Sequence, residues 1–162
     1  MQISWWSKLW NWVYWIGKSN DDIKNAQIGI EHTCPNLSSL ICWVEDRFEY
    51  RGDGFRIHWT QRPITTVHRR KGDCEDFAWL WYDQLTRMGY KPQIWKLYRR
   101  KWYTLGIPVW WHTIAYMWEG EQWNSYTWVL TNNKALKLTI KGYFCDKGYC
   151  TLRRVDNDIK EK

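Results

Sequence analysis

The stretch KGDCEDFAWLW, residues 71–81, decides the fold prediction because it joins a helix start to an unusual cysteine. Asp73 stands where an N-cap residue belongs, and Asp76, three residues later, has the position of the reciprocal partner in a capping box. Apolar residues then recur at spacings of three and four, which predicts a buried stripe of Phe77, Trp81, Leu85 and Met88. Gly89 is suited to the left-handed stop of a helix. The pattern therefore predicts a helix that begins at Cys74.

Cys74 lies in the first turn of this helix, where unpaired N–H groups and the helix dipole stabilise a thiolate. The carboxylates of Glu75 and Asp76 oppose this effect, because nearby negative charge raises the pKa of a thiol. We expect these carboxylates to cap the helix or to pair with the basic residues Arg69, Arg70 and Lys71. An imidazolium beside the sulfur would favour the thiolate and make Cys74 a nucleophile.

His112 is the best candidate for that imidazole among the four histidines, His32, His58, His68 and His112. It lies between Trp111 and Thr113 in an apolar stretch, an unusual position for an ionisable ring without a role. A satisfied core histidine is the alternative interpretation of the same pattern. His68 is closer in sequence to Cys74, but its segment is predicted to be irregular.

The chain as a whole is predicted to be one domain of the α+β class, with helices first and an antiparallel sheet after them. We expect helices at 4–16, after a cap at Ser19 or Asn20, at about 37–48, and from Asp73 to Gly89. Strands are expected at 93–100, 109–118, 123–130 and 135–144, with turns at 50–55 and 119–122 and an irregular segment at 55–70. We expect residues 1–50 to form an N-terminal helical segment packed on the core, 51–150 to form the core, and 151–162 to form a polar tail that frays from Arg153 onward.

The first helix is rich in tryptophan and carries Trp5, Leu9, Val13 and Ile16 on one stripe. We expect these side chains to pack against the domain. Two alternatives are a helix that lies in a lipid interface and a contact with a partner protein. The apolar runs are too short and too interrupted to span a membrane.

The composition is basic and aromatic, with a net charge of +7 and 16 tryptophans in 162 residues. Such a charge favours anionic partners, although dispersed charges can also serve only to keep a protein soluble. The basic runs HRRK (68–71) and YRRK (98–101), together with aromatic rings, would suit single-stranded nucleic acid. That interpretation is the alternative to an enzyme.

Five cysteines and no export signal predict a cytoplasmic protein with mostly free thiols. A four-thiolate zinc site could in principle be formed by Cys34, Cys42, Cys145 and Cys150. Their spacings, however, do not match the short ligand pairs that are usual in such sites. We therefore expect no metal and no cofactor.

The stretches GDCEDFA (72–78), LTRMGYKP (85–92) and WHTIAYMWEGEQW (111–123) together resemble the transglutaminase-like cysteine peptidases. The resemblance is to the bacterial transglutaminase-like cysteine proteinase branch and covers about residues 55–130. It implies a papain-like core with Cys74 as nucleophile and His112 as general base. Asp73, Glu75 and Asp76 match the acidic surround of the motif, which is structural or, in some relatives, part of a calcium site. Small relatives of this kind occur among bacteriophage genes, so a phage origin is also implied.

The third catalytic position departs from the family pattern. The family has aspartate or asparagine four residues beyond a tryptophan that resembles Trp123, and this position is Thr127 here. A two-residue turn at 119–120 would place His112 opposite Thr127, whose hydroxyl would orient the imidazole without the charge of a carboxylate. Asn124 is the other candidate if a bulge intervenes. A Cys–His dyad with a polar helper, a shifted third residue and a decayed enzyme all remain open.

The sequence thus predicts a cysteine hydrolase, either a protease or an amidase-like enzyme, that acts on a protein or peptide through an acyl-enzyme intermediate. The alternative is a catalytically weak or inactive scaffold of the same fold that binds a protein or nucleic-acid partner. The oligomeric state does not follow from the sequence.

Overall fold

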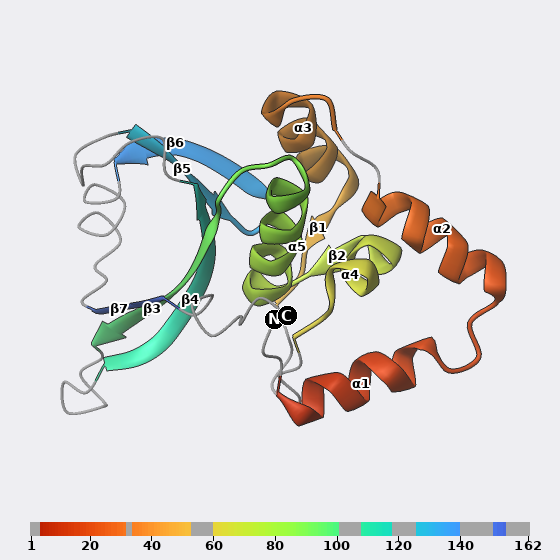
Figure 1. The fold of residues 1–162 in the computed structure, drawn as a ribbon. Coiled ribbons are helices and arrows are strands. Elements are labelled where there is room, and N and C mark those ends of the chain that lie inside the picture. Colours follow the sequence, from red (N-terminus) through yellow and green to blue (C-terminus); the bar gives the residue numbers. More distant parts are fainter. Residues whose placement is uncertain are drawn as a thin grey trace.

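The structure, a computed structural model, describes residues 4–31, 34–52, 60–100, 108–117, 126–139 and 151–154. Its helices are α1 (Trp5–Trp15), α2 (Asn20–Glu31), α3 (Leu37–Arg47), α4 (Pro63–Arg69) and α5 (Cys74–Arg87). Its strands are β1 (Glu49–Tyr50), β2 (Lys71–Gly72), β3 (Gln93–Arg100), β4 (Pro108–Met117), β5 (Tyr126–Thr131), β6 (Lys134–Thr139) and β7 (Thr151–Arg154). The predicted α+β class, with helices ahead of an antiparallel sheet, is confirmed (Figure 1).

The larger sheet has the strand order β6-β5-β4-β3-β7, and every neighbouring pair in it is antiparallel. The pairing of β7 with β3 shows that the prediction of a fraying tail was wrong for its first two residues, Arg153 and Arg154. Four residues with two arginines give too little alternation to predict a strand, and pairing with β3 supplies the missing stabilisation. A second, two-stranded parallel sheet joins β1 to β2, directly before α5.

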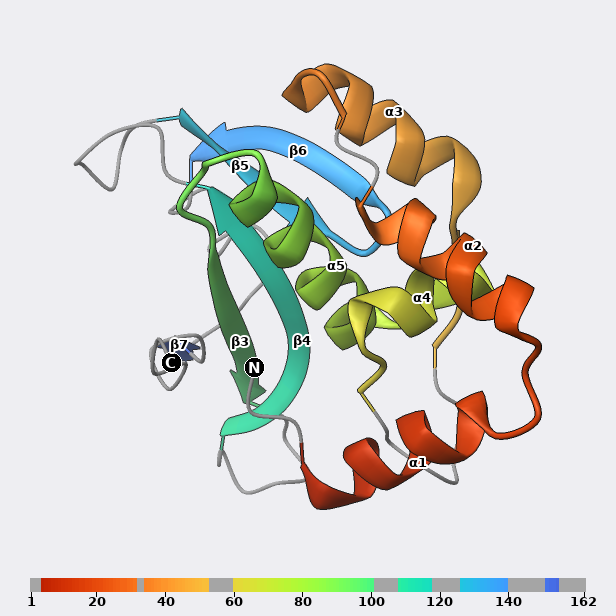
Figure 2. The same ribbon diagram turned by 45° about the vertical axis from the view of Figure 1, so that its right-hand side comes forward.

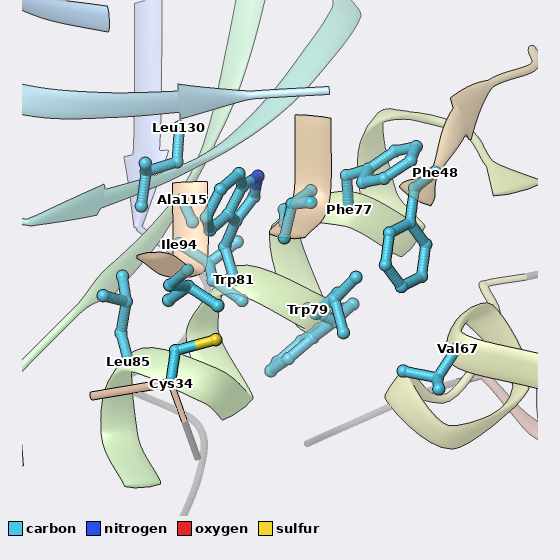
Figure 3. Packing of buried hydrophobic residues seen from close by; sticks show 14 residues of the cluster. Cys34, Phe48, Val67, Phe77, Trp79, Trp81, Leu85, Ile94, Ala115 and Leu130 are labelled. Carbon is cyan, nitrogen blue, oxygen red and sulfur yellow. The ribbon is translucent and has the colours of Figure 1, made fainter. Parts of the chain in front are cut away.

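Helix α5 lies across the curved face of the larger sheet (Figure 2). The predicted stripe is confirmed, because Phe77, Trp81 and Leu85 are fully buried and Met88 packs against the same cluster. Figure 3 shows Trp81 beside Ile94, Ala115 and Leu130 of three neighbouring strands, with Phe77 and Phe48 close to each other. Gly89, with φ +85°, follows the helix as predicted.

Helix α4 lies in the segment that was predicted to be irregular, so that prediction was wrong for Pro63–Arg69. Pro63 stands at the start of the helix, where its missing N–H costs nothing. The β-branched residues that follow have low helix propensity, but Thr65, Thr66 and Val67 are buried and their packing compensates. Arg70, with φ +54°, ends the helix in the left-handed region.

Helices α2 and α3 agree with the sequence predictions and begin with side-chain caps. The Ser19 hydroxyl accepts a hydrogen bond from the Asp22 N–H at 3.1 Å, and the Asp22 carboxylate accepts one from the Ser19 N–H at 3.1 Å. Asn36 caps α3 by accepting from the Ser39 N–H at 2.9 Å. The predicted turn at 50–55 lies partly outside the described residues.

Helix α1 exists as predicted, but it is turned the opposite way. Its buried residues are Ser7 and Asn11, whereas Trp5, Val13 and Ile16 of the expected packing stripe are exposed. The buried Asn11 amide donates to the Thr60 carbonyl at 2.9 Å, and its oxygen accepts from the Arg62 N–H at 2.9 Å and the Thr65 hydroxyl at 3.0 Å. The helix is therefore attached to the domain by hydrogen bonds rather than by its rings.

Candidate functional site

The capping box predicted at the start of α5 is present. The Asp73 carboxylate accepts from the N–H groups of Glu75 at 2.9 Å and Asp76 at 3.1 Å, and Asp76 accepts from the Asp73 N–H at 3.0 Å. Asp76 is fully buried and also accepts from both the backbone N–H and the side-chain amide of Gln61. This network fixes the position of the first helical turn, and with it the position of Cys74.

Gly72 makes room for that network. A Cβ atom at this position would lie 2.6 Å from the Cβ of Asp76 and 2.8 Å from its Oδ2. Real side chains do not approach so closely, so a larger residue at 72 would push Asp76 out of the capping box. The glycine and both aspartates of the GDCED motif thus have a shared structural role.

Cys74 is nearly buried, with 7% of its surface exposed, at the start of α5. Burial raises the pKa of its thiol to about 12, and the negative charges of Asp73, Glu75 and Asp76 act in the same direction. The Thr113 backbone N–H, which donates to the sulfur, lowers the pKa but does not compensate. Burial and the neighbouring carboxylates thus oppose the stabilisation that a helix N-terminus gives to a thiolate.

Glu75 does not pair with the basic residues proposed from the sequence. Its Oε1 lies 2.7 Å from the Nζ of Lys96 on β3, and its Oε2 accepts from the Thr60 hydroxyl at 2.9 Å. A cation from the sheet and a hydroxyl from the loop before α4 therefore hold the carboxylate beside Cys74. This pair could not be predicted, because it depends on how α5 lies against β3, which local sequence patterns do not describe.

His112 lies in β4, directly after a β-bulge. In the β3–β4 register Leu97 pairs with His112 and Tyr98 with Trp110, so Trp111 has no partner. Bulges of this kind redirect neighbouring side chains. The half-buried His112 ring forms a hydrogen bond through Nε2 to the Thr131 hydroxyl at 2.7 Å. The residue after His112, Thr113, contributes the N–H that reaches the Cys74 sulfur.

The predicted register that placed His112 opposite Thr127 was wrong. In the described part of the β4–β5 pair, Ala115 pairs with Leu130, and Met117 pairs with Trp128. The residue that the structure brings to His112 is Thr131, four residues beyond Thr127. Thr127 itself pairs through its backbone with Leu138, and its side chain, like all of Asn124, lies outside the described residues.

Thr131 is thus the site residue that sequence reasoning missed. The Asn132–Asn133 pair that follows it signals a hairpin turn, because two asparagines between alternating stretches are typical of a two-residue turn. The structure has this turn, with Thr131 paired to Lys134 and Asn132 at φ +53°. The turn sets the register of β5 with β6 only, and the contact of Thr131 with His112 depends on the separate register of β4 with β5.

The other candidate ligand groups do not gather at a second site within the part of the chain that the structure describes. There, no set of three or more His, Cys, Asp and Glu side chains is arranged to hold a metal ion. Cys34 and Cys42 are free thiols, the first buried and the second exposed, while Cys145 and Cys150 lie outside the described residues.

The structure describes the side chains of the first basic run, HRRK (68–71), more fully than those of the second, YRRK (98–101). The Tyr14 hydroxyl and His68 Nδ1 are 2.6 Å apart, and Arg69 lies over the Tyr14 ring, so half of the first run is engaged inside the molecule. The arginine side chains of the second run lie outside the described side chains. A pocket of about 250 Å³ is lined by residues of α2, α3 and α4, including Arg47 and Arg70, and not by Cys74.

Known proteins give little further information. No family model matches the sequence, and no curated protein is detectably similar to it. Among solved structures, LapG of Legionella pneumophila is similar with a TM-score of 0.46 and 19% identity over 81% of this chain and 76% of that one. Its calcium-bound form gives 0.45 and 20% over 81% and 74%. A candidate cysteine protease from Cytophaga hutchinsonii gives 0.40 and 14% over 84% and 48%. At these TM-scores the similarities carry no argument about activity.

Proposed function

We propose that this chain is a cysteine hydrolase of the transglutaminase-like, papain-like kind, with Cys74 as nucleophile and His112 as general base. The observation that carries the proposal is the meeting of two segments. The Thr113 N–H donates to the Cys74 sulfur, and the adjacent His112 has one ring nitrogen bonded to Thr131. A protein or peptide amide is the substrate class that this chemistry suits.

The protonation states follow from the raised pKa of Cys74. With a pKa of about 12 the thiol keeps its proton in the resting protein at neutral pH. Because Nε2 of His112 is bonded to Thr131, Nδ1 is the nitrogen that would accept the thiol proton. The proton moves to His112 as sulfur attacks the carbonyl carbon, and His112 then returns it to the leaving amine. Water resolves the thioester.

The cap of α5 leaves a donor for the oxyanion. The Asp73 carboxylate takes the N–H groups of Glu75 and Asp76, so the cap does not use the Cys74 N–H. An N–H at the first helical position has no acceptor within its own helix. It is therefore suited to stabilise the negative oxygen that forms when the adjacent sulfur attacks.

Thr131 limits the expected rate. Its hydroxyl orients the imidazole through the 2.7 Å hydrogen bond, but it carries no charge to stabilise an imidazolium. We therefore expect a slow hydrolase. An aspartate at position 131 would add that charge, and Thr131→Asp is expected to accelerate acylation by roughly tenfold, whereas Thr131→Val is expected to slow it.

The test uses 4-nitrophenyl acetate, which transfers an acetyl group to a reactive thiol and releases a coloured product. The wild-type chain should give a burst of nitrophenolate and an acetyl group that peptide mass spectrometry locates on Cys74. Cys74→Ala should abolish the burst, and His112→Ala should reduce its rate by about 10²-fold or more. Cys42→Ala is the matched control, since Cys42 is an exposed free thiol outside the site.

Acetylation of Cys42 at the same rate as Cys74, or a burst that His112→Ala leaves unchanged, would overturn the proposal. The chain would then be a scaffold of this fold that binds a partner without catalysis. Thermal unfolding of each variant shows whether a lost burst reflects chemistry or folding.

A further inference from the structure

Several large apolar side chains on and directly after α1 are exposed to solvent. Trp5, Trp6 and Trp12 are 66%, 60% and 65% exposed, and Ile16 on the same helix is 58% exposed. Isolated exposed apolar residues are ordinary, but a row of them on one helix marks an interaction site. The feature is independent of Cys74 and of the function proposed above.

The exposed row is a consequence of how α1 is attached. Its polar residues Ser7 and Asn11 face the domain, where the Ser7 hydroxyl accepts from the Thr60 N–H at 3.0 Å and Asn11 bonds Thr60, Arg62 and Thr65. Trp15 adds an indole N–H bond to the Thr65 hydroxyl at 3.1 Å. Because these bonds fix the polar face inward, the apolar face cannot turn toward the core. The outward orientation is thus built into the fold.

The size of this surface favours a membrane over a protein partner. Helix α1 lies at the periphery of the molecule in both views (Figures 1 and 2), and we call its exposed side with Trp5, Trp6, Trp12 and Ile16 the ridge. At ~150–250 Å² per fully buried ring, the three most exposed tryptophans offer roughly 300–500 Å². A stable protein interface needs about 800 Å² from each partner, so a second copy of the chain is a poor match.

The chemistry of the ridge favours a membrane surface. Tryptophan and tyrosine, which have an apolar ring and a polar N–H or O–H, collect at the boundary between lipid headgroups and acyl chains. From Ser4 to Asn20 the sequence contains Lys8 and Lys18 and no acidic residue. Lys8 is exposed on α1, and Arg62 is exposed on the loop that α1 contacts. Asp21 and Asp22 lie beyond, in the first turn of α2.

We propose that the Trp5, Trp6, Trp12 and Ile16 face of α1 docks the protein onto the surface of a bilayer that contains anionic phospholipid. The rings enter the headgroup region while Lys8, exposed on the same helix, contacts phosphate groups. Within the described residues no helix is both long and apolar enough to cross a bilayer, so the contact is interfacial.

The test is co-sedimentation of the full chain with large vesicles. Vesicles of phosphatidylcholine mixed with phosphatidylglycerol should bind the protein, and binding should weaken with pure phosphatidylcholine and with added salt. The double variant Trp5→Ser, Trp12→Ser should lose about tenfold or more in its partition to the mixed vesicles. Tyr90→Ser, an exposed aromatic residue after α5, is the matched control and should bind like the wild type. Cys74→Ala should also bind normally.

The thermal unfolding temperature of the double variant should remain close to that of the wild type, because both rings are largely exposed. Absence of binding to mixed vesicles, or equal binding by wild type and double variant, would overturn the proposal. It would also be overturned if the chain dimerised without vesicles and the double variant did not, because a second copy would then cover the ridge.

Discussion

Helices α1 and α5 are both amphipathic and both rich in tryptophan, yet they face opposite ways. Helix α5 turns Phe77 and Trp81 into the core, whereas α1 turns Trp5 and Trp12 toward solvent and buries Asn11. The difference comes from the surfaces on which they lie. Helix α5 packs on apolar strand residues, and α1 packs on a loop whose backbone groups need hydrogen-bond partners. An apolar stripe therefore predicts that a helix is amphipathic. It does not predict which face of the helix packs against the domain.

The largest expected difference in the free energy of unfolding is between variants that lose one tryptophan from α5 or one from α1. Trp81→Ala should lower the free energy of unfolding by about 3–5 kcal/mol, because a fully buried ring is lost together with its N–H bond to the Asn132 carbonyl. Trp12→Ala should change it by no more than about 0.5 kcal/mol, since the ring is exposed. Urea unfolding of the two variants measures both values. Equal losses would show that the outward orientation of α1 is incorrect.

A smaller loss is expected when the polar attachment of α1 is removed. Asn11→Leu leaves the Arg62 N–H, the Thr65 hydroxyl and the Thr60 carbonyl without their partner and should cost about 2–3 kcal/mol. Asn25→Leu on α2, where the asparagine is exposed, is the control and should be nearly neutral. If Asn11→Leu instead stabilised the protein, the contact of α1 with the domain would be apolar after all.

The smallest expected effect is on the pH dependence of stability. It arises at the start of α5, where that helix buries polar groups. The folded protein holds the Cys74 proton more tightly than the unfolded chain, with a pKa of about 12 against an ordinary 9.0. The resulting stabilisation is complete below pH 9 and is lost as the pH rises toward 12. About 1 kcal/mol of this stabilisation is lost between pH 9 and pH 10.

Cys74→Ser should therefore flatten the decline of stability above pH 9. Cys42→Ser, which replaces an exposed thiol, should keep the wild-type slope. Unfolding in urea at a series of alkaline pH values gives both slopes. Identical slopes in the two variants would mean that the Cys74 thiol is not held in its neutral form. Tyr14, whose pKa burial also raises, contributes equally to both.

Much of the fold followed from local signals in the sequence. The cap and stop residues of α5 predicted its ends, and alternation predicted β3 and β4. Helix α4 and strand β7 were missed because both depend on tertiary partners: α4 on the burial of Thr65 and Thr66, and β7 on pairing with β3. Local propensity is weak in both segments, so no reading of neighbouring residues would have found them.

The parts of the candidate site that depend on neighbouring residues in the sequence could be predicted. The parts that depend on how distant strands pair could not. Cys74 at the first turn and the Asp73–Asp76 cap are local, and the structure has them in place. The partner of His112 depends on how β4 pairs with β5, and the alternating residues of the two strands allow more than one register. The pKa of Cys74 depends on burial by distant segments, which sequence spacing does not describe.

The hairpin turn after Thr131 is held at both of its residues. The Asn132 carbonyl accepts from the Trp81 indole at 2.9 Å, and the Asn133 amide donates to the Phe48 carbonyl at 2.9 Å. The turn is thereby tied to α5 on one side and to the end of α3 on the other. The hydroxyl that holds the His112 ring is preorganised by this double attachment, so aligning the imidazole for proton transfer requires little loss of conformational entropy when a substrate arrives.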